Sequence, residues 1–177
     1  MAEIDLRGNY LWSGGFPREE QLVAREAYRL MCVFAASPEL SRRRGDDETS
    51  AYGSAMQEFE YVEISRILIS LAAILRNQWD LDRARTADFI GTATANQSVG
   101  VLIPDMKAPT KTKPLTIRES FNKIVHANLV NLDRSKAGSI TSGHLEPFVH
   151  LYGEYGDKEW KATIDIFSWV EVVHWLS

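Results

Sequence analysis

Apolar residues recur at intervals of three and four over the first half of the chain, which is the spacing of amphipathic helices. The first such segment begins at Pro17, which suits an initial helical turn, and is predicted to end near Ala36 because Pro38 follows. A second segment begins after Ser54 and Gln57, which have capping-box spacing, and runs to about residue 78. The polar stretch between the two segments is predicted to be a loop.

A third helix has the sharpest predicted start in the chain. Thr116 and Glu119 form a capping box, Pro114 precedes them, and apolar positions continue at helical spacing to Leu129. Residues 91–114 contain glycine, proline, threonine and lysine without a period, so they are predicted to be a long surface loop. A short helix around residues 81–90 is compatible with the sequence before that loop.

The period changes from Leu145 onward, where the pattern becomes typical of strands. Two runs, residues 148–152 and 160–167, flank the turn-like sequence Tyr155-Gly156-Asp157-Lys158 and predict a β-hairpin. Ser168 and Glu171 again have capping-box spacing, which favours a short helix from about residue 169 to residue 176. The valines in that segment leave a continued strand as the alternative.

These elements predict a mostly α protein of the α+β type, namely a helical bundle with a C-terminal β-hairpin and a short terminal helix. The length of 177 residues suits one domain covering residues 1–177. Within it, residues 17–131 are predicted to form the bundle, and residues 145–177 the hairpin and the terminal helix.

Composition narrows the class of protein. Hydrophobic residues make up 45% and charged residues 25% of the chain, which are ordinary globular values and argue against a disordered or fibrous protein. The net charge of -4 argues against a uniformly basic nucleic-acid surface. The single cysteine, Cys32, cannot form an intrachain disulfide, and no apolar run approaches the ~18 residues of a membrane span. Because the N-terminus also lacks an apolar signal segment, a cytoplasmic protein without a membrane partner is predicted.

No metal ion and no cofactor are predicted. The histidines His144, His150 and His174 lack the paired spacing of metal ligands. The sequence has neither a glycine-rich phosphate loop nor a serine nucleophile elbow. Cofactor-binding and metal-ligating residues are therefore not assigned.

Three polar residues, Arg118, Asn122 and His126, line one edge of the third predicted helix because they are spaced four residues apart. A guanidinium stabilises phosphate charge, a carboxamide orients a neighbouring group, and an imidazole moves protons near neutral pH. This set suits phosphodiester cleavage without a metal. His126 is the predicted general acid or base, Arg118 stabilises the developing charge, and Asn122 orients the imidazole.

Residues 122–127 resemble the signature of the HEPN superfamily (higher eukaryotes and prokaryotes nucleotide-binding). Its members are small helical-bundle proteins, many of them ribonucleases of toxin and defence systems. The family motif is an arginine, then a polar residue, then a histidine; Asn122 and His126 match the last two in spacing. Phe121 stands at the arginine position, and Arg118 lies one turn earlier. The resemblance implies an endoribonuclease, or a protein that binds RNA or a nucleotide, and a homodimer whose two copies complete the site.

Two other functions remain open. Glu60 and Glu63 are similar to the first half of the acidic Mg²⁺ motif of all-α nucleotide pyrophosphohydrolases, whose second half is absent from this sequence. Alternatively, the chain is a non-enzymatic homodimeric interaction module that uses the hairpin edge or the apolar C-terminus. In that case the polar stripe is structural, and Arg118 pairs with a carboxylate such as Glu58 or Glu60.

Overall fold

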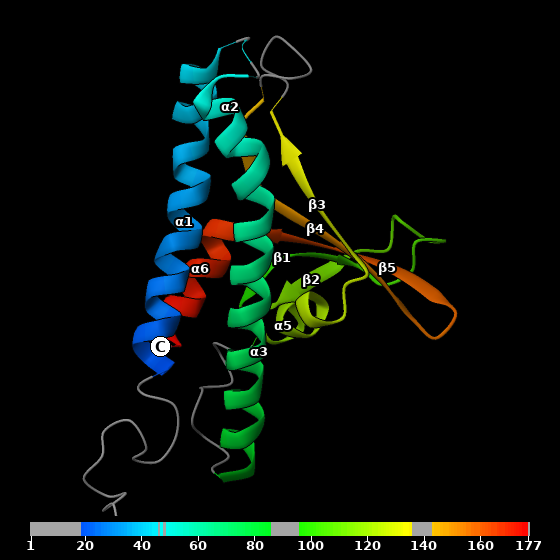
Figure 1. The fold of residues 1–177 in the computed structure, drawn as a ribbon. Coiled ribbons are helices and arrows are strands. Elements are labelled where there is room, and N and C mark those ends of the chain that lie inside the picture. The colour runs from blue at the N-terminus through cyan, green and yellow to red at the C-terminus, as the bar shows by residue number, and fades with distance from the viewer. Residues whose placement is uncertain (1–18, 46, 48, 86–95, 136–142, 177) are drawn as a thin grey trace, which may run out of the picture.

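The protein, described by a computed structural model over residues 19–45, 47, 49–85, 96–135 and 143–176, combines long helices with one sheet (Figure 1). The N-terminal half is helical, with α1 (Glu19–Arg44), α2 (Ala51–Ala55), the π-helical segment η1 (Met56–Glu60) and α3 (Tyr61–Arg85). The second half contains β1 (Ser98–Ile103), β2 (Lys113–Thr116), α5 (Ile117–Val125), β3 (Leu129–Arg134), β4 (Leu145–Tyr155), β5 (Lys158–Asp165) and α6 (Ile166–Trp175).

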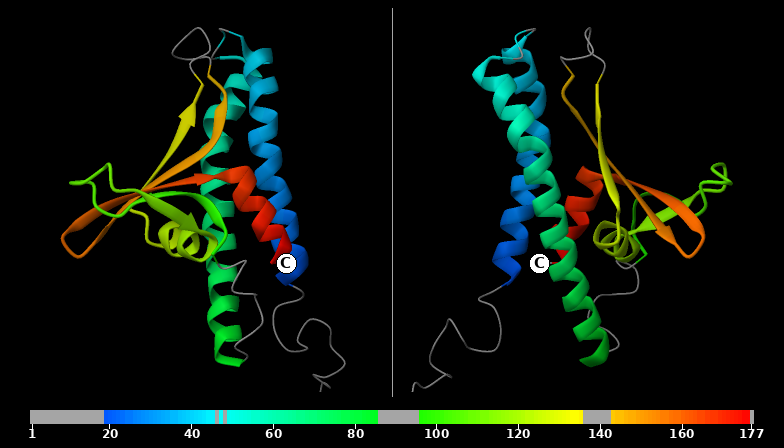
Figure 2. Two further views of the ribbon diagram at one scale, coloured as in Figure 1. Left: turned by 180° about the vertical axis from the view of Figure 1, so that it is seen from behind. Right: turned by 45° about the vertical axis from the view of Figure 1, so that its right-hand side comes forward.

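The five strands form a single antiparallel sheet in the order β2-β1-β5-β4-β3. Helices α1, α5 and α6 contact the sheet, while α3 packs against α1 and α5. Both views in Figure 2 show α1 and α3 side by side, with the sheet to one side of them. In β5, buried side chains alternate with more exposed ones, as expected for a strand with one face on the core.

The predicted helical bundle is wrong, because the protein is α+β with a five-stranded sheet. The predicted loop over residues 91–114 contains all of β1 and the start of β2, and Leu129, the last residue of the predicted third helix, is the first residue of β3. The hairpin at Tyr155 and Lys158 is confirmed, but β4 and β5 lie in the middle of the sheet. An isolated hairpin would expose unpaired backbone along both edges, and β1 and β3 cover those edges.

Helix α1 does not end before Pro38 but continues through it to Arg44, so the predicted end near Ala36 is wrong. Tertiary contacts offset the hydrogen bond that proline cannot donate. Ser37 is fully buried, and its Oγ accepts a hydrogen bond of 3.0 Å from the backbone N–H of Leu145 at the start of β4. The C-terminal part of α1 is therefore hydrogen-bonded to the start of β4.

The second long helix begins earlier and ends later than predicted. Ser50 is the N-cap, with its Oγ accepting from the backbone N–H of Gly53 at 3.1 Å, so the predicted cap at Ser54 is wrong. Helical structure then continues through α2, η1 and α3 to Arg85. The predicted short helix over residues 81–90 overlaps the end of α3, and residues 86–90 lie outside the described residues.

The terminal helix is confirmed as α6, and the alternative of a continued strand is wrong. Its cap is Asp165 rather than Ser168, because the Asp165 carboxylate accepts from two backbone N–H groups of the first turn. Trp169 of α6 is fully buried, contacts Phe121 edge-on at 6.1 Å, and donates from Nε1 to Ser120 Oγ at 2.9 Å. In the described part of the chain, no helix is both long enough and apolar enough to cross a bilayer.

Candidate functional site

Helix α5 positions the predicted polar stripe. Its start is confirmed, since Thr116 Oγ1 accepts from the backbone N–H of Glu119 at 3.3 Å. The helix ends at Val125, sooner than predicted, and His126 is its C-cap with φ -105° and ψ 13°. The side chain of His126 is therefore carried by the end of the helix, where a side chain is more exposed than along a packed face.

The turn after His126 is fixed against the hairpin at Gly153. Asn128 donates its backbone N–H to the carbonyl of Tyr152 at 2.8 Å. A Cβ at position 153 would lie 2.3 Å from Cζ2 of Trp160 and 2.9 Å from the His126 carbonyl oxygen. Only glycine allows this close approach, because real Cβ atoms essentially never come nearer than 3.0 Å to another atom. The backbone of His126 is thus anchored to β4.

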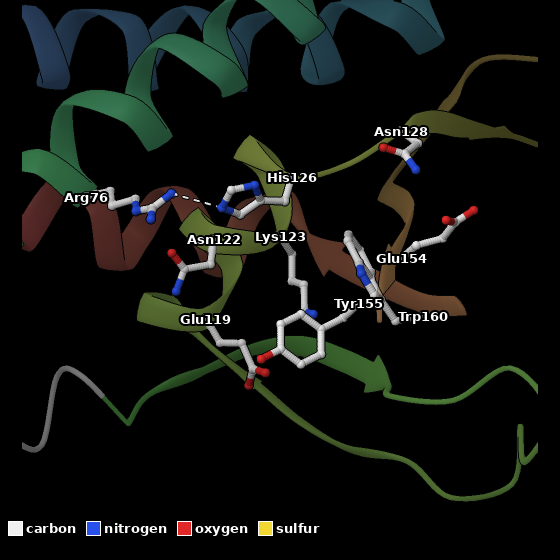
Figure 3. A pocket seen from close by; sticks show the side chains of 9 residues that line it. All are labelled: Arg76, Glu119, Asn122, Lys123, His126, Asn128, Glu154, Tyr155 and Trp160. Atoms are coloured by element: carbon white, nitrogen blue, oxygen red, sulfur yellow. Dashed lines mark hydrogen bonds between the residues drawn. The ribbon is translucent and has the colours of Figure 1, made fainter. Parts of the chain in front are cut away.

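The imidazole of His126 is hydrogen-bonded to an arginine from another helix. Nη1 of Arg76, on α3, lies 3.2 Å from Nε2 of His126 (Figure 3). A guanidinium can only donate, so Nε2 accepts and the ring in this arrangement is neutral with its proton on Nδ1. The sequence interpretation assigned the orientation of the imidazole to Asn122, whereas in the structure Arg76 forms the hydrogen bond to the His126 ring.

These groups face a cleft of about 620 Å³, which we call the α3–α5 cleft. It lies between α3, the exposed end of α5 and the tip of the β4–β5 hairpin (Figure 3). Its lining side chains carry both charges and two aromatic rings, and they are Arg76, Glu119, Asn122, Lys123, His126, Asn128, Glu154, Tyr155 and Trp160.

Lys123 supplies a second cation to the cleft. Its Nζ lies 4.1 Å from the centroid of the buried Trp160 ring, within cation–π range. Burial lowers the pKa of Lys123, and the nearby Glu119 carboxylate partly opposes that shift. Glu119 itself forms an ion pair of 3.0 Å with Lys113 of β2.

Arg118 lies in a smaller neighbouring recess of about 150 Å³ rather than in the α3–α5 cleft. Its guanidinium is 6.0 Å from the ring centroid of Trp79 on α3. Arg76 and Asn122 line both spaces, so the recess and the cleft are contiguous. The structure therefore brings Asn122 and His126 to one cleft and places Arg118 beside it.

Glu60 and Glu63, the residues of the acidic motif, both form ion pairs with arginines other than Arg118. Glu60 pairs at 2.7 Å with Arg134 of β3, so the suggested pairing of Glu60 with Arg118 is wrong. Glu63 pairs with Arg29 and with Arg66, the latter at 3.0 Å, and Arg66 lowers the pKa of Glu63. Both carboxylates are thus held by arginines, which weakens the case for a Mg²⁺ site there.

Two of the other described histidines, His144 and His150, link neighbouring strands or their ends, whereas His174 lies exposed on α6. His150, on β4, lies 2.9 Å through Nδ1 from Thr163 Oγ1 of β5 and 2.7 Å through Nε2 from the Asp133 carboxylate of β3. His144 Nδ1 lies 2.8 Å from Ser135 Oγ. These contacts cross the sheet and join neighbouring strands.

Sequence reasoning missed Arg76, Lys123 and Trp160. Arg76 belongs to the second long helix, and nothing in its local sequence indicates that its side chain meets residue 126. Lys123 directly follows Asn122 in the sequence, and this position next to the polar stripe could have indicated that Lys123 lies near the site. Trp160 is buried, and its ring also contacts the Lys123 ammonium.

Glu154 and Tyr155 reach the cleft because the hairpin folds back over the end of α5, whereas Asn128 lies in the turn that follows α5. Comparison with protein-family models, with curated protein sequences and with solved structures finds no match for this chain.

Proposed function

We propose that the α3–α5 cleft binds RNA and cleaves it, with His126 as the proton-transferring group and Arg76, Lys123 and Arg118 as the cations that hold phosphate. The observation that carries the proposal is the hydrogen bond between Arg76 and His126 inside a cleft that also holds a second cation. Fixed positive charge beside an imidazole that can accept or donate a proton is what phosphoryl chemistry needs at the developing charge.

The resemblance of residues 122–127 to the HEPN signature supports the choice of RNA as ligand. The resemblance applies to the site alone, because the fold is not a helical bundle. Arg76, which comes from α3, supplies the arginine that the segment itself lacks at Phe121. RNA is available in the cytoplasm, the location that the sequence predicts.

The proposed reaction begins when the phosphate draws the guanidinium of Arg76 away from His126. Nε2 then becomes free to accept the proton of the ribose 2′-hydroxyl. The 2′-oxygen forms a bond to phosphorus, the bond from phosphorus to the 5′-oxygen breaks, and the leaving oxygen takes a proton from water. The hydroxide that remains takes the proton of the His126 imidazolium, which restores the neutral ring. The products are a 2′,3′-cyclic phosphate and a 5′-hydroxyl, and the cations stabilise the charge that develops on the phosphate.

The test is an RNA cleavage assay with purified protein and a labelled single-stranded RNA, run with a chelator and again with Mg²⁺. We expect cleavage in both conditions and a loss of about 100- to 10,000-fold in His126→Ala. His174→Ala is the matched control, because His174 is exposed on α6 and does not line the cleft. Wild-type protein that neither binds nor cuts RNA would exclude the proposal.

A homodimeric interaction module is the second candidate, favoured by exposed apolar side chains on one side of the second long helix. Phe59, Val62 and Ile69 are 58%, 62% and 52% exposed. Light scattering tests this candidate, since a chain of 20.0 kDa that stays monomeric at micromolar concentration is not such a module. A dimer that binds no RNA would favour it over the nuclease.

A further inference from the structure

A second recess opens beside the α3–α5 cleft. It has a volume of about 250 Å³ and lies among the β1–β2 connection, the turn between α5 and β3, and the β4–β5 hairpin. Asn128, Glu154 and Trp160 line both spaces, so the two adjoin each other. A ligand with its phosphate at Arg76 and Lys123 can therefore extend into this recess, which we call the hairpin recess.

The walls of the hairpin recess are largely apolar. Met106, Leu129 and Tyr152 line it, and Leu129 is 57% exposed although it stands directly opposite Tyr152 in the β3–β4 register. Its volume is below the roughly 300–1,000 Å³ of pockets for drug-sized molecules, so it suits one flat ring system. Apolar and aromatic side chains are the surfaces on which proteins stack unpaired nucleobases.

Two carboxylates give the recess its polar edge. Glu154 and Glu159 are direct cross-strand partners in the hairpin, and both are exposed. Like charges directly opposite each other on neighbouring strands are destabilising. Within the described ranges, neither carboxylate forms an ion pair that would offset the repulsion. This arrangement suits a ligand that brings hydrogen-bond donors.

We propose that the hairpin recess holds a nucleobase of the RNA and selects guanine. An ionised carboxylate only accepts hydrogen bonds. Guanine presents adjacent N–H donors, at N1 and N2, on its Watson–Crick edge, and one carboxylate can accept both. Cytosine and adenine each present one exocyclic amine, and the N–H of uracil lies between two carbonyls that a carboxylate repels.

The inference deepens the proposed function, because it rests on that function for the phosphate end of the ligand. Glu159 is the residue assigned to base selection. Glu159 lines the hairpin recess and not the cleft, whereas Glu154 lines both. The backbone carbonyl of Glu159 accepts from the Met106 N–H at 2.8 Å, a bond that a side-chain substitution leaves in place.

The experiment is isothermal titration calorimetry of the full chain with the nucleoside monophosphates GMP, AMP, CMP and UMP, with guanosine, and with inorganic phosphate. We expect GMP to bind about tenfold or more tightly than the other three nucleotides, the size of one charge-assisted hydrogen bond. Glu159→Gln should remove that preference and leave the affinity for inorganic phosphate unchanged. Glu171→Gln, an exposed carboxylate on α6, is the matched control and should behave as wild type.

The probes separate the two proposals. Equal affinity for all four nucleotides, with phosphate still bound, overturns guanine selection and leaves the phosphate cleft standing. Guanosine that binds where inorganic phosphate does not supports the base recess and contradicts the proposed function. Failure of every probe to bind overturns both, and circular dichroism of Glu159→Gln establishes that the variant is folded.

Discussion

Arg76 and His126 are 50 positions apart in the chain, yet their side chains meet at 3.2 Å between Nη1 and Nε2. The contact joins the middle of α3 to the C-cap of α5, and these two helices pack against each other. In the absence of RNA, the contact fixes both the orientation and the tautomer of the imidazole. The proposed chemistry depends on this pair more than on the stripe along α5.

Replacement of Arg76 tests that dependence. We expect Arg76→Ala to lower the kcat for RNA cleavage about 100- to 1,000-fold, the usual effect of removing one donor that stabilises developing charge. Arg76→Lys should recover only part of the activity, because an ammonium lacks the planar donor fork. Arg25→Ala controls for net charge, since Arg25 is an exposed arginine of α1 that does not line the cleft. An equal loss in Arg25→Ala would mean that only net charge matters.

The lowered pKa of Lys123 predicts a pH dependence for phosphate binding. Burial disfavours the charged ammonium, so Lys123 loses its proton below the ordinary lysine pKa of about 10.4. The affinity for inorganic phosphate should therefore decline as pH rises through the lowered pKa. Lys123→Arg stays charged and should keep its affinity over the same range, and titrations from neutral pH upward compare the two proteins. Identical profiles would show that Lys123 does not hold the phosphate.

The lowered pKa of Lys123 also affects folding stability, which rises with pH where the phosphate affinity declines. The unfolded chain binds the lysine proton more tightly than the folded chain, so the folded protein gains stability as pH rises between the folded and unfolded pKa values.

Gly153→Ala should loosen the anchor of His126. The added Cβ meets the Trp160 ring and the His126 carbonyl, and overpacking of this kind costs about 1–3 kcal/mol of unfolding free energy. Urea denaturation measures the loss. Trp160→Leu removes the nearest ring atoms, so the double variant should lose less than the sum of the two single variants. Strict additivity would argue that Gly153 and Trp160 are not in contact.

Ser37→Ala should destabilise the fold, because it leaves the buried N–H of Leu145 without its acceptor. The expected loss of unfolding free energy is about 1–3 kcal/mol. Thermal unfolding measures this loss. Ser54→Ala is the matched control: Ser54 is exposed in α2 and is not the cap of that helix, so a change within about 0.5 kcal/mol is expected. A larger effect at Ser54 than at Ser37 would contradict the hydrogen bond between Ser37 and Leu145 as the stabilising contact.

The sequence by itself determined the elements whose signals are local. The start of α5 at Thr116, the hairpin turn at Gly156 and the terminal helix follow from capping, turn and period rules that act within a few residues. The spacing of Asn122 and His126 also determined that they lie at one cleft, because residues four apart on a helix share an edge.

Only the tertiary structure decided the sheet and the partners of the site. Strands β1, β2 and β3 are four to six residues long, too short for alternation to be read reliably, and they exist because β4 and β5 offer unpaired backbone edges. Helix α1 passes Pro38 because Ser37 is buried against β4. Arg76 reaches His126 because α3 packs on α5, and packing between distant segments leaves no local pattern in the sequence.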